Sequence, residues 1–544
     1  MGIPSYFSYI VKNHPEIIQK FIKGEVSIDN LYIDANSIIY DSYHSLNVNE
    51  TKNITKTLIE KVIDKIKSYI DVVSPTKKVI VSFDGVAPVA KLEQQRTRRF
   101  KAWFQTTITN NLNKIEEQHW STASITPGTS FMKELNTKIT EYFKKYNFSN
   151  PHGPTVTVSS SDEPGEGEHK ICQYIRMNPT HKNDTTVIYG LDADLIMLAI
   201  NHLPLCNKIY LFRETPDFIK SIDSDLEPNH NYLFDIQRLA INIVTDMQQE
   251  VKFSDTDAEQ RLYDYIFMCF LLGNDFLPHF PAINIRTGGV DKLLQHYKST
   301  IGQTNKFMVN MKTKQIIWKN VRKLIESLSL QEQTYIIAEH KSRNKRERNY
   351  KHGNKQSKPD LSEDDKVNNV LNTIQNIPCT ERGTECFINP ERECWEHRYY
   401  TQLIHIEPDE DRVKQVCVNY LEGLEWTFKY YISDCPDWRW KYNYHYPPLL
   451  TDLVKHIPYF DTTFIQKNNS KPLDQRVQLC YVLPRRNLSL LPYKIYNKLQ
   501  TRFSNYYPEK ADFEWSYCRY FWEAHPKLPE INIKTLEETL IIDS

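Results

Sequence analysis

The chain has 544 residues, with 68 basic and 68 acidic side chains and a formal net charge of zero at pH 7. This length suggests two to four domains, whose cores need no disulfide or metal to be stable. A global positive field is excluded, so a nucleic-acid partner would need a local basic patch. No window of about 18 apolar residues predicts a transmembrane helix, and the first residues lack the regions of a signal peptide.

The ten cysteines indicate a reduced, intracellular protein, because most of them stand singly in apolar runs. We expect a cytoplasmic rather than a nuclear location, and a monomer. One group could hold zinc, but its gaps of six, seven and two residues are not those of a zinc finger, and ordinary cysteines are favoured: Cys379, Cys386, Cys394 and His397.

Short apolar runs alternate with helical patterns over the first 215 residues. Each run is β-branched or aromatic, as buried parallel strands are. The alternation predicts an α/β domain with a mainly parallel sheet flanked by helices. Strands are predicted at Asn30–Asp34, Lys78–Asp84, Thr155–Ser159, Thr186–Gly190 and Lys208–Arg213, and the helices between them include Ile54–Ile70 and Ala90–Asn111.

The composition changes after the first 335 residues. We predict a catalytic domain over 1–335, a charged, unstructured linker over 336–370, and a largely helical, Trp/Tyr-rich second region over 371–544 that packs on the first. The linker is rich in charge and almost free of aliphatic residues, so it cannot form a core. Its basic half could be a nuclear signal or an RNA tether, although a solvated linker is the simpler interpretation.

Acidic residues follow three of the predicted strands, and two further segments, PGEGEHK and LGNDF, supply more. Ligand sites of parallel sheets lie beyond the carboxyl ends of the strands, so we expect these side chains to converge. The set has seven members: Asp34, Asp84, Glu166, Glu168, Asp192, Asp194 and Asp275.

Carboxylates are hard oxygen ligands that suit Mg²⁺ or Mn²⁺ and not Zn²⁺. Clustered acids repel one another unless a cation neutralises them. Two ions about 4 Å apart can activate a water and stabilise a leaving oxygen in phosphodiester hydrolysis. Each acid alone could be a helix cap or a surface charge, but together the seven predict a metal-dependent nuclease in which all of them bind metal and serve catalysis.

A basic helix follows Asp84, beginning near Pro88. Four of its residues fall on one face at helical spacing: Lys91, Gln95, Arg98 and Arg99. Guanidinium forks and an ammonium on one face are a phosphate site. The alternative is a solvated basic face, which is weakened by the candidate metal ligand seven residues upstream.

These segments resemble those of the XRN family of 5′→3′ exoribonucleases, whose catalytic domain is similar to flap endonucleases and PIN-like nucleases. The matching segments in the first region are MGIPSYFSYI, LYIDANSIIY, SFDGVAPVAKLEQQRTRRFK, ITPGTSFM, PGEGEHKI, YGLDADLIML with LFRE, and CFLLGNDFLPHFP. In the second region they are YLEGLEWTFKYY and CPDWRWKYNYHYPP.

The resemblance implies roles for particular residues. The seven acids correspond to the family's metal ligands, and the basic face corresponds to its 5′-monophosphate pocket. The family stacks the first bases between a His and a Trp. Here Tyr40 stands at the His position, where it can stack but cannot be protonated, and Trp438 or Trp440 would be the partner.

The function implied is Mg²⁺-dependent, processive 5′→3′ degradation of single-stranded RNA with a 5′-monophosphate, releasing mononucleotides by hydrolysis with two ions. Two alternatives stay open. A catalytically silent RNA-binding scaffold should have lost some of the acids, and all seven are present. A flap-type DNA 5′-nuclease is disfavoured by KLEQQRTRRFK together with the Trp/Tyr-rich second region.

Overall fold

A seven-stranded sheet organises the first half of the chain in the computed structural model, which describes residues 3, 5–47, 51–113, 120–248, 253–354 and 363–541. The strand order is β1-β7-β6-β5-β2-β3-β4. The strands are β1 (Ile18–Lys20), β2 (Asn30–Asp34), β3 (Lys78–Ser82), β4 (Thr155–Ser159), β5 (Thr185–Tyr189), β6 (Lys208–Glu214) and β7 (Asn231–Asp235).

The five predicted strands form the parallel part of the sheet, with β2 between β3 and β5. This confirms the predicted α/β class with a mainly parallel sheet. β7 and β1 extend one edge through two antiparallel pairings, so that β7 alone runs against the other strands, and the sequence did not predict either strand. The parallel strands bring their carboxyl ends to the same edge of the sheet.

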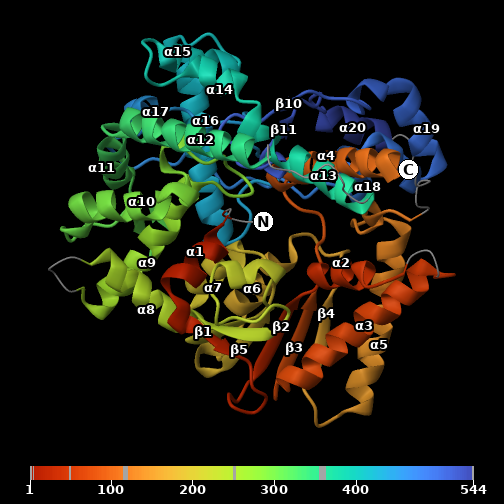
Figure 1. Cartoon of the computed structure of the whole chain (residues 1–544). Coiled ribbons are helices and arrows are strands. Elements are labelled where there is room, and N and C mark those ends of the chain that lie inside the picture. Colours follow the sequence, from red (N-terminus) through yellow and green to blue (C-terminus); the bar gives the residue numbers. More distant parts are fainter. Residues whose placement is uncertain are drawn as a thin grey trace.

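Helices cover both faces of the sheet (Figure 1). Leu31 and Ile33 of β2 pack with α3 (Ile54–Val73) and α5 (Ser130–Ser149), and Tyr32 points to the opposite cluster. That cluster includes α6 (Gly167–Met177), α7 (Asp194–His202), α1 (Tyr6–Asn13) and α8 (Ile236–Met247). The side chains of β2 therefore alternate between the two cores, as expected for a strand buried on both faces.

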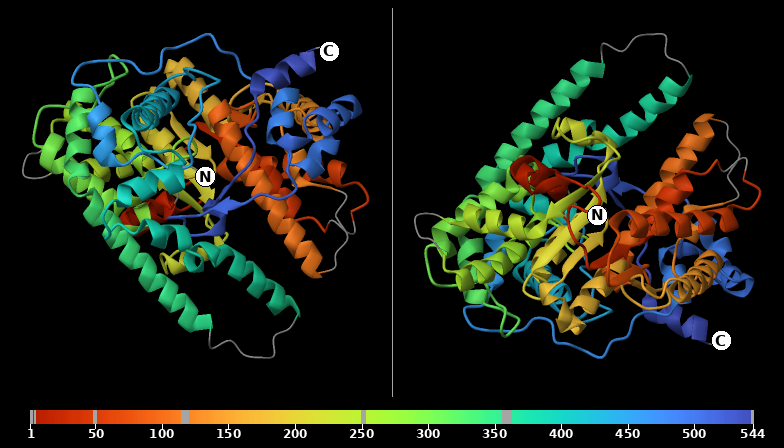
Figure 2. Two further views of the ribbon diagram at one scale, coloured as in Figure 1. Left: turned by 90° about the horizontal axis from the view of Figure 1, so that it is seen from above. Right: turned by 90° about the horizontal axis from the view of Figure 1, so that it is seen from below.

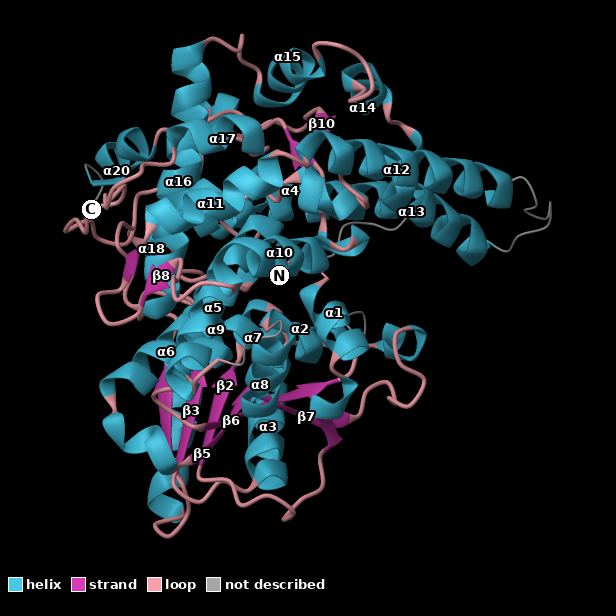
Figure 3. Cartoon of the chain, turned by 90° about the vertical axis from the view of Figure 1, so that its left-hand side faces the viewer, coloured by secondary structure: helices cyan, strands magenta, loops and turns pink. Residues whose placement is uncertain are grey.

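The second region is largely helical, as predicted, and lies above the sheet in Figure 3. One apolar cluster extends from Ile3 to Tyr517, so the two regions share a core. The remaining helices are α2 (Asn36–His44), α4 (Val89–Asn113), α9 (Asp255–Cys269), α10 (Gly289–Tyr297), α11 (Trp318–Ser329), α12 (Glu332–Asn354), α13 (Glu363–Thr380), α14 (Gly383–Ile388), α15 (Trp395–Tyr399), α16 (Glu410–Ile432), α17 (Leu450–His456), α18 (Gln475–Val482), α19 (Tyr493–Arg502) and α20 (Ile533–Ile541). Two small hairpins pair β8 (Val309–Asn310) with β9 (Gln315–Ile316) and β10 (Phe513–Glu514) with β11 (His525–Pro526).

The described part of the predicted linker is helical. α12 and α13 run side by side and project from the body of the molecule (Figure 2), while residues 355–362 lie outside the described part. Arg343 of α12 donates from Nε to both carboxylate oxygens of Glu385 at 2.9 Å, and Thr287 bonds to Glu339 at 2.8 Å. The prediction of an unstructured segment was wrong for these described residues, because ion pairs of α12 and the buried side chain of Ile336 hold this helix against its neighbours.

No helix in the described ranges is long and apolar enough to cross a membrane.

Candidate active site

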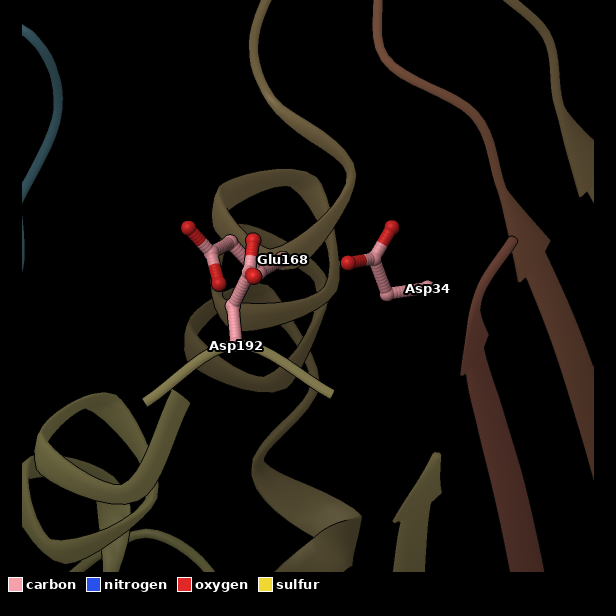
Figure 4. Close-up of side chains that lie close together, drawn as sticks. All are labelled: Asp34, Glu168 and Asp192. Atoms are coloured by element: carbon pink, nitrogen blue, oxygen red, sulfur yellow. The ribbon is translucent and has the colours of Figure 1, made fainter. Parts of the chain in front are cut away.

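Three predicted acids converge at the carboxyl edge of the sheet (Figure 4). Asp34 ends β2, Glu168 lies in the first turn of α6, and Asp192 lies between β5 and α7. One carboxylate oxygen from each lies within 4.8 Å of the other two. Asp34 and Glu168 are buried and Asp192 is exposed, so the cluster opens to solvent on one side. This is the juxtaposition expected from strand ends in a parallel sheet.

Three acids at this edge of the sheet each have one buried oxygen without a compensating donor in the described ranges. Asp34 Oδ1, Glu168 Oε2 and Asp194 Oδ1 are buried without a hydrogen-bond partner among the described residues. Burial, and then repulsion from Asp84 and Asp192, raises the pKa of Asp34 well above its usual range. Burial and the neighbouring carboxylates likewise raise the pKa of Glu168, and burial raises that of Asp194 to about 7. A divalent cation would satisfy these oxygens and neutralise the repulsion, so the donor set fits Mg²⁺ or Mn²⁺.

The raised pKa values predict how the metal-free protein responds to pH. Between about pH 4, where an unfolded carboxyl ionises, and the pKa of about 7 of Asp194, the folded state holds protons that the unfolded state has lost. Raising the pH through this window therefore favours unfolding. We expect the Tm in EDTA to fall from pH 5 to pH 7.5, and excess Mg²⁺ to abolish most of that fall. Thermal denaturation at both pH values checks this, and a Tm that changes equally with and without Mg²⁺ would contradict it.

Asp84 is held in place from two sides. The side-chain amide of Asn36 donates to its carboxylate, and the Gly167 amide donates to Asp84 Oδ1 at 2.7 Å. A Cβ at Gly167 would lie 2.6 Å from Asp34 Oδ1, closer than any real contact. Glycine is therefore required where α6 begins, because the backbone approaches two carboxylates there.

Glu166 and Asp275 form a second acidic group with different partners. Lys91 Nζ lies 2.5 Å from both Glu166 Oε2 and Asp275 Oδ2. Gln94 Nε2 donates to Asp275 Oδ1 at 2.6 Å, and the Tyr430 hydroxyl donates to Glu166 Oε1 at 3.1 Å. Gln94 and Tyr430 are not among the site residues expected from the sequence. Gln94 lies one turn after Lys91 and could have been considered, but nothing in the sequence places α16 against Glu166.

Lys91 dominates the electrostatics of this second group. Burial raises the pKa of Asp275, but the ammonium outweighs it and holds that pKa well below its usual range. Burial lowers the pKa of Lys91, and the two carboxylates outweigh it and raise that pKa well above its usual range. Lys91 is thus a buried, charged ammonium between two carboxylates, and not a solvated member of a basic face.

The other members of the predicted phosphate face differ in their exposure, and the charge of Arg98 helps to lower the pKa of Asp275. Arg98 is exposed, whereas Arg99 is half-buried with Nη1 lacking a partner among the described residues. Burial lowers the pKa of Arg99 to about 10, opposed by the nearby Tyr40. Gln95 Oε1 is also buried without a described partner. The unpaired Nη1 of Arg99, close to Tyr40, is a donor suited to an anionic ligand, whereas the Gln95 oxygen is an acceptor and is not.

A cavity of about 800 Å³ lies beside α4. Gln94, Arg98 and Asp275 line it from the first region, and Lys441 and Tyr444 line it from the second. Both regions therefore line the space beside α4 and Asp275, and Asp275 is the one member of the seven acids in that lining.

The two candidate tryptophans occupy different environments. Trp440 is buried and stacks on Trp426 with ring centroids 5.4 Å apart, and its Nε1 donates to Glu422 at 3.3 Å. Trp438 is half-buried, and its carbonyl accepts from the Val89 amide at the start of α4 at 3.0 Å. Trp440 therefore belongs to the core, and Trp438 is the alternative that lies beside the basic helix.

Carboxylates at the carboxyl edge of a parallel sheet, next to a basic helix, are the arrangement of metal-dependent enzymes that act on phosphate esters. Comparisons with known proteins narrow this class. Residues 1–215 match the family model described as the XRN 5′-3′ exonuclease N-terminus, and residues 255–391 and 388–542 match the model of the Xrn1 helical domain. The chain belongs to the XRN family of 5′-3′ exoribonucleases.

Curated relatives agree over nearly the whole chain. The 5′-3′ exoribonuclease 2 homolog of Drosophila melanogaster is 27% identical over 99% of this chain and 71% of its own length. The 5′-3′ exoribonuclease 1 of Saccharomyces cerevisiae is 29% identical over 99% of this chain, which spans 43% of that protein. Among solved structures, the catalytic core of Rad2 with a DNA substrate is 12% identical, covers 56% of this chain and 75% of its own, and has a TM-score of 0.30. That score is too low to argue from, and the fold class rests on the sheet and helices described above.

Proposed function

We propose that this protein degrades single-stranded RNA from a 5′-monophosphate end, one nucleotide at a time, with Mg²⁺ or Mn²⁺ held by the acids as two ions. The observation that carries the proposal is the position of α4. Its Lys91 contacts two acids, while Gln95, Arg98 and Arg99 continue the same face beside Tyr40. A terminal phosphate on this face would lie next to the carboxylates.

The residues would divide the work as follows. Arg98, Arg99 and Gln95 bind the 5′-phosphate, with the guanidinium groups supplying forked donors. Tyr40 and Trp438 stack on the first bases. Asp34, Glu168 and Asp192, with the other acids around them, hold the cations. Bound there, Mg²⁺ would activate a water and stabilise the leaving oxygen.

A panel of 5′ ends tests the proposal. The same RNA is prepared with a 5′-monophosphate, hydroxyl, triphosphate or cap and incubated with Mg²⁺, beside a DNA of the same sequence. Two charge-assisted hydrogen bonds to the phosphate are together worth at least about 3 kcal/mol, so the monophosphate RNA should be degraded about 100-fold faster than the hydroxyl RNA. EDTA should stop the reaction. Internal cuts, or equal rates for all 5′ ends, would overturn the proposal.

A further inference from the structure

The acids of the site fall into two groups that differ in whether their buried oxygens have hydrogen-bond or ion-pair donors. Asp34, Glu168 and Asp194 each have a buried oxygen without a described partner. By contrast, both oxygens of Glu166 and both oxygens of Asp275 have donors: Tyr430, Gln94 and, for one oxygen of each, Lys91. One group is open to a cation and the other already holds one, the ammonium of Lys91.

We propose that Lys91 closes the Glu166–Asp275 pair to a second divalent cation until a 5′-phosphate draws its ammonium away. This inference rests on the proposed function, since the phosphate is the trigger. It gives Lys91 a role beyond phosphate binding, because it makes completion of the metal site depend on the chemistry of the RNA end.

The exclusion of a second divalent cation by Lys91 follows from charge and distance. The Lys91 ammonium is buried and lies 2.5 Å from one oxygen of each carboxylate. A dication at the same carboxylates would meet a positive charge within a few Å in a site of low effective dielectric. It would also have to displace the Gln94 and Tyr430 donors from the remaining oxygens. The ammonium therefore strongly weakens the binding of a second divalent cation at these two carboxylates.

The movement of the Lys91 ammonium toward a 5′-phosphate follows from the geometry of α4. Lys91, Gln95 and Arg98 lie on one helical face, so a phosphate held by Gln95 and Arg98 is a neighbour of Lys91. A phosphate monoester carries a charge of about −1.5 to −2 at pH 7, and the lysine side chain is a flexible stem with a compact charge. Once the ammonium turns to the phosphate, Glu166 and Asp275 are left as buried, like charges, which bind a cation strongly.

This device would make the 5′-phosphate control the rate of the chemical step and not only binding. RNA with a 5′-hydroxyl could still stack on Tyr40 and Trp438, but it would leave Lys91 on the carboxylates. Discrimination would then appear mainly in kcat, as expected for an interaction that completes the catalytic site.

Mn²⁺ titration followed by electron paramagnetic resonance tests the inference without any nuclease assay. For the unaltered protein alone, we expect one tightly bound Mn²⁺ and a second bound about tenfold or more weakly. A 5′-phosphorylated oligoribonucleotide with a non-hydrolysable first linkage should bring the second ion to comparable affinity, and its 5′-hydroxyl counterpart should not. Lys91→Met should bind both ions tightly in the absence of RNA.

Two further variants keep the test interpretable. Lys91→Gln retains a donor without the charge, and it should also gain the second ion if Lys91→Met fails to fold. Lys133→Met is the matched control, because it removes a lysine charge from the exposed surface of α5; it should keep a single tight ion in the protein alone. Two ions of equal affinity in the unaltered protein, or an unchanged count in both Lys91 variants, would overturn the inference. The counts without RNA do not depend on the substrate, so failure of the proposed function would show separately, as indifference to the 5′ end.

Discussion

Asp192→Asn should lower the rate of RNA hydrolysis by about 10³-fold or more, because loss of a metal ligand removes several kcal/mol of transition-state stabilisation at about 1.4 kcal/mol per tenfold. Asn keeps the shape of Asp and removes its charge. Asp192 is exposed at the mouth of the cluster, so its replacement leaves the core intact. Single-turnover rates with 5′-phosphorylated RNA at saturating Mg²⁺ measure the effect.

Asp34→Asn separates catalysis from stability. Its carboxylate is buried, lacks a partner for Oδ1 and has a pKa raised by burial and by neighbouring acids. Neutralising it should lower the rate of RNA hydrolysis about as much as Asp192→Asn does. It should also raise the Tm of the protein in EDTA. Glu60→Gln on the exposed face of α3 is the control, and should change neither quantity. An Asp34→Asn protein that is fully active would show that the cluster does not hold the catalytic metal.

The parallel part of the fold could be predicted from the sequence because each strand is a short apolar run with its own turn signals. Asn30–Asp34 and Thr155–Ser159 have the predicted bounds, and the other parallel strands differ by one or two residues at one end or at both. β1 has only three residues, and β7 pairs antiparallel at the edge. β1 is too short to carry a pattern that distinguishes it from a loop, whereas β7 (NYLFD) has the same short apolar run as β2 and could have been predicted as a strand, but not its antiparallel pairing.

The site could be predicted as a set of residues but not as a set of contacts. Strand ends place Asp34 and Asp192 together, which follows from the parallel topology. The contact of Lys91 with Glu166 and Asp275 depends on how α4 sits against the loop after α9, and helical periodicity says nothing about that. Likewise, the pattern DWRW does not indicate whether Trp438 or Trp440 stacks on a base, because that depends on the partners of each ring in the structure.

The packing of Trp440 makes a large and specific prediction. Trp440→Ala should lower the free energy of unfolding by about 3–5 kcal/mol, because it removes a large buried ring and leaves a cavity. The ring stacks on Trp426, and a Cβ at Gly423 would lie 2.8 Å from Trp440 Cη2, so the surrounding structure is closely fitted to it. Chemical denaturation followed by far-UV circular dichroism measures the loss.

Trp438→Ala is the matched comparison. Its half-buried ring contributes less to the core, so its replacement should cost clearly less stability than that of Trp440. If it stacks on a base, the loss of about 1–3 kcal/mol should raise the KM for RNA about 5-fold to 150-fold. The reverse pattern, with Trp440→Ala stable but weak in RNA binding, would assign the stacking role to Trp440. We expect instead that Trp440 stabilises the packing of α16, whose Tyr430 bonds to Glu166, and that Trp438 stacks on the substrate beside α4. Only one residue lies between the two tryptophans in the sequence.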